Sequence, residues 1–163
     1  MPLKDFCSRE VACISPQASI REAAKLMRDR HVGDLVVVEN PDHPRKPLGI
    51  ITDRDLAIRV LTDTQSPDAF KIEDVMNRDL LVVRTDDGLF HATEALERAG
   101  VRRLPIVDQD GNLKGLISAD DLYEILAEEL GNLSRISTRQ GSREGPGFKK
   151  GTNNHSQESV SHA

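Results

Sequence analysis

The chain has 163 residues, of which 37% are hydrophobic and 30% are charged, and its formal net charge is −5. This composition is typical of a globular protein with one ordinary domain or two very small ones. No apolar run reaches the roughly 18–20 residues of a transmembrane helix, so we expect no membrane span. The polar N-terminus favours a cytoplasmic location over export. The acidic balance and scarce aromatic residues argue against nucleic-acid binding.

The first clearly predicted element is a helix that begins after Ser19. Ser19 suits the N-cap position, and Glu22 three residues later completes a capping box. Apolar residues then recur at helical spacing on one face: Ile20, Ala23, Ala24 and Met27. Two apolar runs follow, LVVVE at 35–39 and LGIIT at 48–52, and they predict two strands joined by a turn. A second helix is expected from residues 53–55 to 62.

The same order of elements returns in the second half of the chain. Three pairs of segments resemble each other: 14–27 and 83–96, 32–39 and 101–108, 48–56 and 114–122. The offset falls from 69 to 66 because the second hairpin loop is shorter, with a turn at Asp110-Gly111. Each copy predicts a short strand, a helix, two strands and a final helix, the last one at 121–130. Two units are too few for a solenoid, so we expect them to pack face to face.

The pattern divides the chain into a first repeat at 1–66, a second repeat at 67–136 and a tail at 137–163. Apolar side chains are scarce in the tail, which is rich in Gly, Ser, Asn, Lys and Gln. Such a segment buries too little surface to offset the entropy of ordering it, so we predict a disordered tail. A solubilising extension is the simplest role, and contact with anionic partners through its basic residues is the alternative.

Three segments carry a resemblance to a known family: GIITDRD (49–55), GLISADD (115–121) and RRLPIVD (102–108). With their spacing, they resemble the CBS domain, named for cystathionine β-synthase, as a tandem pair over about residues 5–132. The resemblance implies an α/β fold of two β-α-β-β-α repeats, packed sheet to sheet with pseudo-twofold symmetry. It also implies two clefts that can bind AMP, ADP, ATP or S-adenosylmethionine.

Each final helix begins with the pattern [ST]-x-x-D, which Thr52 and Asp55 form in the first copy and Ser118 and Asp121 in the second. A carboxylate in the first helical turn can accept hydrogen bonds from both ribose hydroxyls of a nucleotide. The free N–H groups of the helix terminus suit a phosphate. The alternative is that both pairs are only N-caps, since these residue types favour helix starts.

In members of the family, each cleft combines the signature Asp of one repeat with residues before the LP strand of the other. The Asp55 cleft would then receive Arg102 and Arg103, with Arg54 nearby, and guanidinium groups suit a phosphate. The alternative is that the two arginines form ion pairs with Asp34, Asp53 or Asp120. The candidate ligand-binding residues are Ile50, Thr52, Arg54, Asp55, Val83, Val101, Arg102, Arg103, Pro105, Ser118 and Asp121.

The second cleft, around Asp121, should differ in charge. Asp34 stands there at the position that Arg103 holds in the other copy, and Asp120 is nearby. Carboxylates beside a phosphate repel it by about 1–4 kcal/mol at 4 Å. The sequence therefore predicts that phosphorylated ligands prefer the Asp55 cleft.

We expect a non-catalytic regulatory module that senses an adenosyl nucleotide and signals to a protein still unknown. No P-loop, HExxH or CxxC pattern is present, so we predict no catalytic residue and no metal site; Mg²⁺ would enter only through nucleotide phosphates. A purely structural module with vestigial clefts, binding of S-adenosylmethionine or NAD, and an unrecognised nucleotide hydrolase are the alternatives. Apolar residues on the final helices, 55–62 and 121–130, predict a homodimer.

Overall fold

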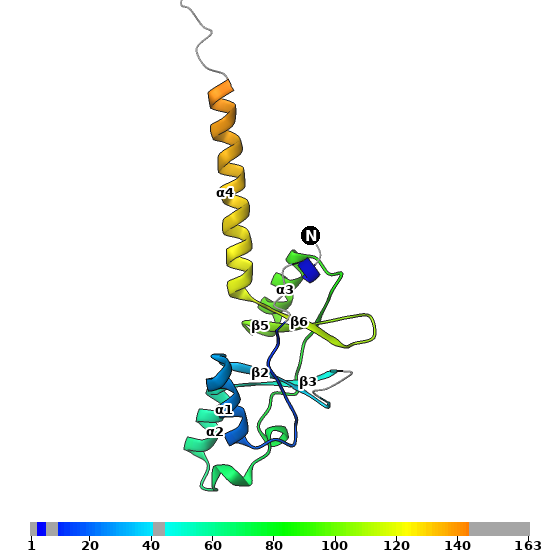
Figure 1. Ribbon diagram of the computed structural model, residues 1–163, viewed down its shortest axis with the longest axis vertical. Coiled ribbons are helices and arrows are strands. Elements are labelled where there is room, and N and C mark those ends of the chain that lie inside the picture. The colour runs from blue at the N-terminus through cyan, green and yellow to red at the C-terminus, as the bar shows by residue number, and fades with distance from the viewer. Residues whose placement is uncertain (1–2, 6–9, 41–44, 144–163) are drawn as a thin grey trace, which may run out of the picture. The chain divides into compact units, whose positions relative to one another are not determined.

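The computed structural model describes residues 3–5, 10–40 and 45–143 (Figure 1). The described residues up to Ile125 form one compact unit, and those from Leu126 onward form a second. The predicted tail lies outside the described residues from position 144 onward.

The first repeat has the predicted order of elements. They are β1 (Cys13–Ile14), α1 (Ile20–Arg30), β2 (Asp34–Val38), β3 (Pro47–Thr52) and α2 (Asp53–Thr62). Strand β2 is central, parallel to β1 and antiparallel to β3, and Figure 1 shows α1 and α2 together on one side of this sheet. The predicted capping box is confirmed: the Ser19 hydroxyl accepts from the Glu22 N–H at 3.2 Å, and the Glu22 carboxylate accepts from the Ser19 N–H at 2.7 Å.

The second repeat reproduces this arrangement. Its elements are β4 (Val83–Arg84), α3 (Leu89–Ala99), β5 (Arg103–Val107), β6 (Leu113–Ser118) and α4 (Ala119–Arg143). Strand β5 is central, and the register is equivalent in the two sheets: Asp34 faces Thr52 in the first, and Arg103 faces Ser118 in the second. The expected mixed α/β fold of two repeats is therefore confirmed.

Alternation along the central strands places one apolar face toward the helices and the other toward the opposite sheet. In β2, Leu35 and Val37 belong to the core that α1 and α2 cover. Val36 and Val38 point the other way and form a cluster with Leu113 of the second sheet. The two repeats thus pack sheet to sheet, as the repeat pattern predicted.

The packing divides the chain differently from the predicted boundary at 66/67. Phe70, Ile72 and Met76, from the connection between the repeats, are buried in the first core, and the Arg59 guanidinium lies 4.8 Å from the centre of the Phe70 ring. Leu3 is fully buried in the core of the second repeat, and its N–H donates to the Asp87 carbonyl at 3.0 Å. Each repeat is therefore completed by a segment outside its own sequence copy. Three short 3-10 helices lie in these segments, η1 (Leu3–Asp5), η2 (Pro67–Ala69) and η3 (Ile72–Asp74).

Helix α4 is longer than predicted, since it ends at Arg143 rather than near residue 130. Residues 137–143, which were predicted as the start of a disordered tail, are therefore helical. The sequence contains Gly131, which costs a helix interior only about 1 kcal/mol relative to Ala. Apolar residues continue at helical spacing past this glycine, at Leu133 and Ile136. No helix in the described part of the chain is long and apolar enough to cross a membrane.

Candidate functional site: two clefts between the repeats

Asp55 and Asp121 close equivalent capping boxes at the starts of α2 and α4. The Asp55 Oδ2 atom accepts from the Thr52 hydroxyl at 2.7 Å and from the Thr52 N–H at 2.9 Å. The Asp121 Oδ2 atom accepts from the Ser118 hydroxyl at 2.6 Å and from the Ser118 N–H at 2.7 Å. Both signature pairs are thus N-caps, as the alternative expected. Within the described residues the Oδ1 atom of each carboxylate makes no hydrogen bond, so capping leaves one oxygen for a ligand.

The Asp55 cleft is a cavity of about 720 Å³, a size that suits a nucleotide. Both repeats line it, and the predicted residues Ile50, Thr52, Arg54, Asp55, Val101, Arg102 and Arg103 all reach it. Asp34, Asp53 and Asp120 add carboxylates to the wall. A hollow of about 580 Å³ shares Ile50, Asn77, Val101 and Arg103 with this cleft.

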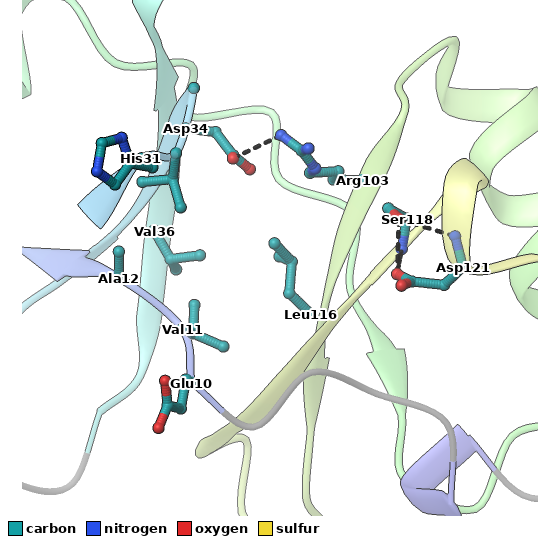
Figure 2. Close-up of a pocket in the computed structure, with 12 residues that line it drawn as sticks. Glu10, Val11, Ala12, His31, Asp34, Val36, Arg103, Leu116, Ser118 and Asp121 are labelled. Atoms are coloured by element: carbon teal, nitrogen blue, oxygen red, sulfur yellow. Dashed lines mark hydrogen bonds and ion pairs between the residues drawn. The ribbon is translucent and has the colours of Figure 1, made fainter. Parts of the chain in front are cut away.

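The Asp121 cleft is smaller, about 250 Å³ (Figure 2). Asp34, Ser118 and Asp121 line it as predicted, and Val36 also reaches it. Asp120, which was expected here, lines the Asp55 cleft instead. The sequence did not indicate that the N-terminal segment Glu10, Val11 and Ala12 would form part of this wall. No motif marks that segment, which reaches the cleft only because the chain crosses between the repeats.

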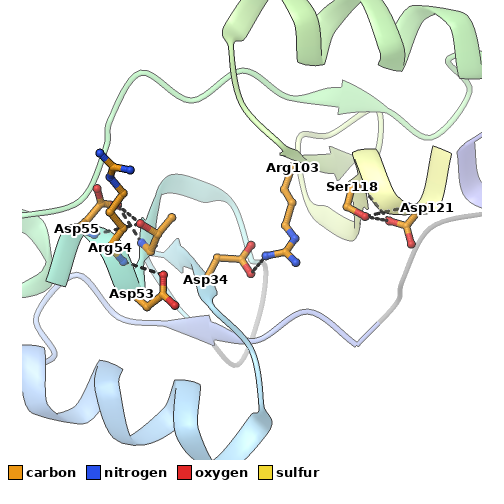
Figure 3. A network of polar contacts seen from close by, with 8 residues as sticks. Asp34, Asp53, Arg54, Asp55, Arg103, Ser118 and Asp121 are labelled. Carbon is orange, nitrogen blue, oxygen red and sulfur yellow. Dashed lines mark hydrogen bonds and ion pairs between the residues drawn. The ribbon is translucent and has the colours of Figure 1, made fainter. Parts of the chain in front are cut away.

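An ion pair joins the two repeats between the clefts (Figure 3). The Arg103 Nη1 atom donates to the Asp34 Oδ1 atom at 2.6 Å; the Asp34 side chain is 8% exposed and that of Arg103 40%. Burial raises the pKa of Asp34, while the Arg103 charge acts in the opposite direction. The second oxygen of Asp34, Oδ2, is buried without a hydrogen-bond partner among the described residues.

The other two arginines of the Asp55 cleft are exposed. Arg102 donates to the Asp120 carboxylate at 3.1 Å, an exposed ion pair. The guanidinium of Arg54 has no ion-pair partner among the described residues. Two of the three ion-pair partners named as alternatives in the sequence analysis are therefore found: Asp34 pairs with Arg103, and Asp120 pairs with Arg102. The third, Asp53, pairs with neither arginine among the described residues.

Two predicted residues do not reach either cleft. Val83 is 1% exposed in the core of the second repeat, where β4 pairs with β5. Pro105 is fully buried in β5, two residues after Arg103, the residue of this strand that lines the clefts. The structure therefore places neither of them among the residues that line the clefts, because both side chains are buried.

Asn77 is a cleft residue that the sequence analysis missed. Its backbone exchanges two hydrogen bonds with Ile50, at 2.9 and 3.1 Å. A side chain at Gly49 would place its Cβ only 2.6 Å from the Asn77 carbonyl oxygen. Gly49 was therefore the one sign in the sequence that another backbone segment approaches β3 closely.

Within the described residues, no group of three or more His, Cys, Asp or Glu is placed to hold a metal ion. The polar side chains of the clefts offer carboxylate acceptors, guanidinium donors and helix N-termini. This donor set can bind a ligand that carries both hydroxyl and anionic groups.

Comparisons with known proteins agree with this geometry. The model of the CBS domain matches residues 3–61 and 72–128. The chain is 37% identical over 123 residues to the CBS domain-containing protein YhcV of Bacillus subtilis, covering 74% of this chain and 81% of that protein. It is 35% identical over 121 residues to an uncharacterized protein of Methanopyrus kandleri, covering 74% of this chain but only 60% of that protein.

Solved structures show the same fold. The CBS domain pair of protein MJ0100, solved in complex with 5′-methylthioadenosine and S-adenosyl-L-methionine, has a TM-score of 0.68 at 22% identity and covers 79% of this chain and 98% of that one. The CBS-pair protein CBSX2 from Arabidopsis thaliana has a TM-score of 0.66 at 25% identity, covering 78% and 94%. With two matched copies and two equivalent sheets, the chain belongs to the CBS domain family as a tandem pair.

Proposed function

We propose that this protein is a regulatory module without catalysis of its own, which binds an adenosine phosphate (AMP, ADP or ATP) in the Asp55 cleft. One observation carries the proposal. The capped carboxylate of Asp55 and the guanidinium groups of Arg54, Arg102 and Arg103 line one cavity that both repeats form. A ligand there would touch both repeats at once, so its binding energy could change their relative packing.

The proposed pose follows from the chemistry of the wall. The free Oδ1 atom of Asp55 accepts hydrogen bonds from the ribose hydroxyls, beside Thr52. Arg103 faces the phosphate from the opposite repeat, helped by Arg102 and Arg54. The adenine ring lies toward Ile50 and Val101, where the adjoining hollow provides apolar surface.

The ligand complex of the MJ0100 pair supports an adenosyl ligand as a class. S-adenosylmethionine is therefore the alternative ligand for this chain. NAD, which contains an adenosine phosphate, is a further alternative. Such a sensor would act in the cytoplasm and pass its state to a regulated protein. Mg²⁺ would be held only through the phosphates.

A homodimer is part of the proposal. Helix α2 exposes Ile58, Val60 and Leu61 to solvent, with Leu61 82% exposed. The part of α4 beyond residue 125 exposes four further apolar side chains: Leu126, Leu130, Leu133 and Ile136. Exposed apolar surface of this kind marks interaction sites, and a second copy would cover equivalent faces by symmetry.

Isothermal titration calorimetry with AMP and adenosine tests the ligand site. Asp55→Ala should weaken AMP binding about 10- to 150-fold, since hydrogen bonds to a charged group contribute roughly 1.5–3 kcal/mol. Arg103→Ala should weaken AMP binding but leave adenosine nearly unchanged, because adenosine carries no phosphate. Asp121→Ala should matter less for AMP than Asp55→Ala does.

A control separates ligand binding from helix capping. Glu22→Ala removes the equivalent carboxylate of the capping box on α1, which lines neither cleft. It should lower stability by an amount similar to Asp55→Ala without changing AMP affinity. If Glu22→Ala weakened AMP binding as much as Asp55→Ala, capping rather than contact would explain the loss.

A structural module with vestigial clefts is the second candidate. The observation that favours it is that Arg102 and Arg103 already have carboxylate partners in the protein itself. In that case the wild-type protein would bind neither AMP, ATP, S-adenosylmethionine nor NAD at millimolar concentration, while remaining folded and dimeric.

A further inference from the structure

The Asp34–Arg103 ion pair joins equivalent positions of the two repeats. The two residues are 69 positions apart, which is the repeat offset, and each begins the central strand of its sheet. A pseudo-twofold axis that exchanges the repeats therefore exchanges these residues, and the pair lies where that axis passes between the sheets. Both side chains line both clefts.

The two clefts have unequal access to positive charge. Arg54 and Arg102 line only the Asp55 cleft, whereas Arg103 is the one Arg or Lys of the described chain that lines the Asp121 cleft. The Asp121 cleft also contains the carboxylates of Glu10, Asp34 and Asp121 and the imidazole of His31. An anion in either cleft must therefore use the same guanidinium.

We propose that Asp34 and Arg103 form a switch shared by the two clefts, so that a phosphorylated ligand in the Asp55 cleft excludes a second anion from the Asp121 cleft. The proposal rests on the function proposed above and specifies its regulation. The phosphate draws Arg103 away from Asp34, and the nearly buried Asp34 carboxylate then faces the Asp121 cleft without its partner. That cleft becomes selective for nucleosides whose 5′ substituent is uncharged or cationic.

Release of Asp34 from Arg103 should make the Asp34 carboxylate easier to protonate. A carboxylate that is 8% exposed and has one oxygen unbonded is poorly solvated once Arg103 leaves, so protonation becomes more favourable. AMP binding should therefore take up part of a proton at Asp34. In either protonation state of Asp34, the Asp121 cleft has lost Arg103, the one Arg or Lys of the described residues that lines it. The ionisable groups around Asp34, on its own and neighbouring elements, are Arg103, Asp53, His31, Glu10, Asp120 and Asp121.

Titration of AMP into single and double variants tests the switch. Asp34→Asn keeps the side-chain shape but removes the charge that holds Arg103. It should raise AMP affinity at least about fivefold, which corresponds to about 1 kcal/mol at 1.4 kcal/mol per tenfold change. In an Arg103→Gln background the same Asp34→Asn change should alter AMP affinity less than twofold. An equal gain in AMP affinity with and without Arg103 would mean only that a charge repelling the phosphate had been removed. That result would overturn the proposed switch.

A second test needs no variant: it measures how many AMP molecules bind per chain and how AMP changes the binding of S-adenosylmethionine. Wild-type protein should bind one AMP per chain, and AMP should strengthen the binding of S-adenosylmethionine, whose sulfonium is cationic, rather than compete with it. Two equal AMP sites, or simple competition, would refute the proposal. Absence of any AMP or adenosine binding would instead refute the proposed function, so the two failures are distinguishable.

Proton uptake is the third measurement. The apparent enthalpy of AMP binding at constant pH should differ between buffers of different ionisation enthalpy. The number of protons taken up per AMP, obtained from that difference, should fall in Asp34→Asn, where the phosphate still titrates but Asp34 does not. An unchanged buffer dependence in Asp34→Asn would show that Asp34 gains no proton, and would overturn the release of Asp34 from Arg103.

Discussion

At the scale of single residues, the first helix of each repeat ends in the same left-handed backbone conformation, but a different residue adopts it. Helix α3 ends at Gly100 with φ 63°, and α1 ends at His31 with φ 55°. Glycine adopts this left-handed conformation at no steric cost. For a residue with a Cβ the conformation costs about 1 kcal/mol.

His31→Gly should therefore raise the free energy of unfolding, by about 0.5–1 kcal/mol. Urea denaturation followed by circular dichroism measures this change. The reciprocal substitution, Gly100→His, should lower stability by a similar amount. A His31→Ala variant as stable as His31→Gly would contradict the argument, because alanine carries the same Cβ.

At the scale of elements, the β5–β6 hairpin is held by Asp108. Its carboxylate accepts from the N–H of Asn112 at 2.8 Å and lies 3.0 Å from the Lys114 ammonium. These contacts lower the pKa of Asp108 from 3.8 to about 2, with the Asn112 N–H as the largest cause. The charged form is thus favoured in the folded protein.

A lowered pKa means that the stabilisation is present above pH 3.8 and disappears as the pH falls toward 2. Asp108→Asn should lower the unfolding free energy at pH 6, and the difference from wild type should vanish near pH 2. Urea titrations at several pH values measure it. The exposed Asp110→Asn in the same turn is the control for the loss of one negative charge. A wild-type advantage that persisted at pH 2 would contradict this account.

Helix α4 is the element whose exposed residues most favour self-association. Leu126, Leu130 and Leu133 recur at spacings of four and three, which is the pattern of a helix-helix seam. The double substitution Leu126→Glu and Leu130→Glu should shift the protein from dimer to monomer at micromolar concentration, as measured by light scattering. Glu128→Lys, a charge change on another face, should leave the dimer intact. A wild-type protein that is monomeric under these conditions would rule out the dimer.

At the scale of the whole compact unit, each repeat is completed by a segment from the other side of the sequence boundary. Leu3 is fully buried in the second core although it belongs to the first sequence repeat, residues 1–66. Phe70 and Ile72 are buried in the first core although they follow it. The two repeats should therefore unfold together rather than as separate domains.

Leu3→Ala should lower the unfolding free energy by about 2–5 kcal/mol, the usual cost of truncating a buried leucine. It should leave a single cooperative transition in calorimetry, with the whole unit melting earlier. The exposed Asp5→Ala is the matched control and should change stability by less than about 0.5 kcal/mol. Two separated transitions in the wild-type protein would contradict this coupling.

Local patterns in the sequence were sufficient to predict the repeat, its elements and both signature carboxylates. A capping box such as Ser19 with Glu22 depends on residues three apart, and strand alternation depends on neighbours, so both can be read along the chain. The residues of the Asp55 cleft could be predicted because the two copies align and the family resemblance specifies how they face each other.

Contacts between distant residues could not be predicted in the same way. Val83 and Pro105 were assigned to the cleft, but strand packing buries them, and only the three-dimensional register determines which side a residue faces. The burial of Leu3 in the second core and the close approach of Asn77 to Gly49 both depend on the path of irregular segments. Such segments have no periodicity from which their contacts could be predicted.

The sequence by itself determined the two-copy architecture and the unequal charges of Asp34 and Arg103, because both follow from aligning the copies residue by residue. Only the tertiary structure decided that these two residues meet each other and line both clefts. The physical reason is the pseudo-twofold packing, which brings equivalent positions of the two sheets together near the axis. There a carboxylate opposite a guanidinium forms an ion pair, whereas two like charges would repel.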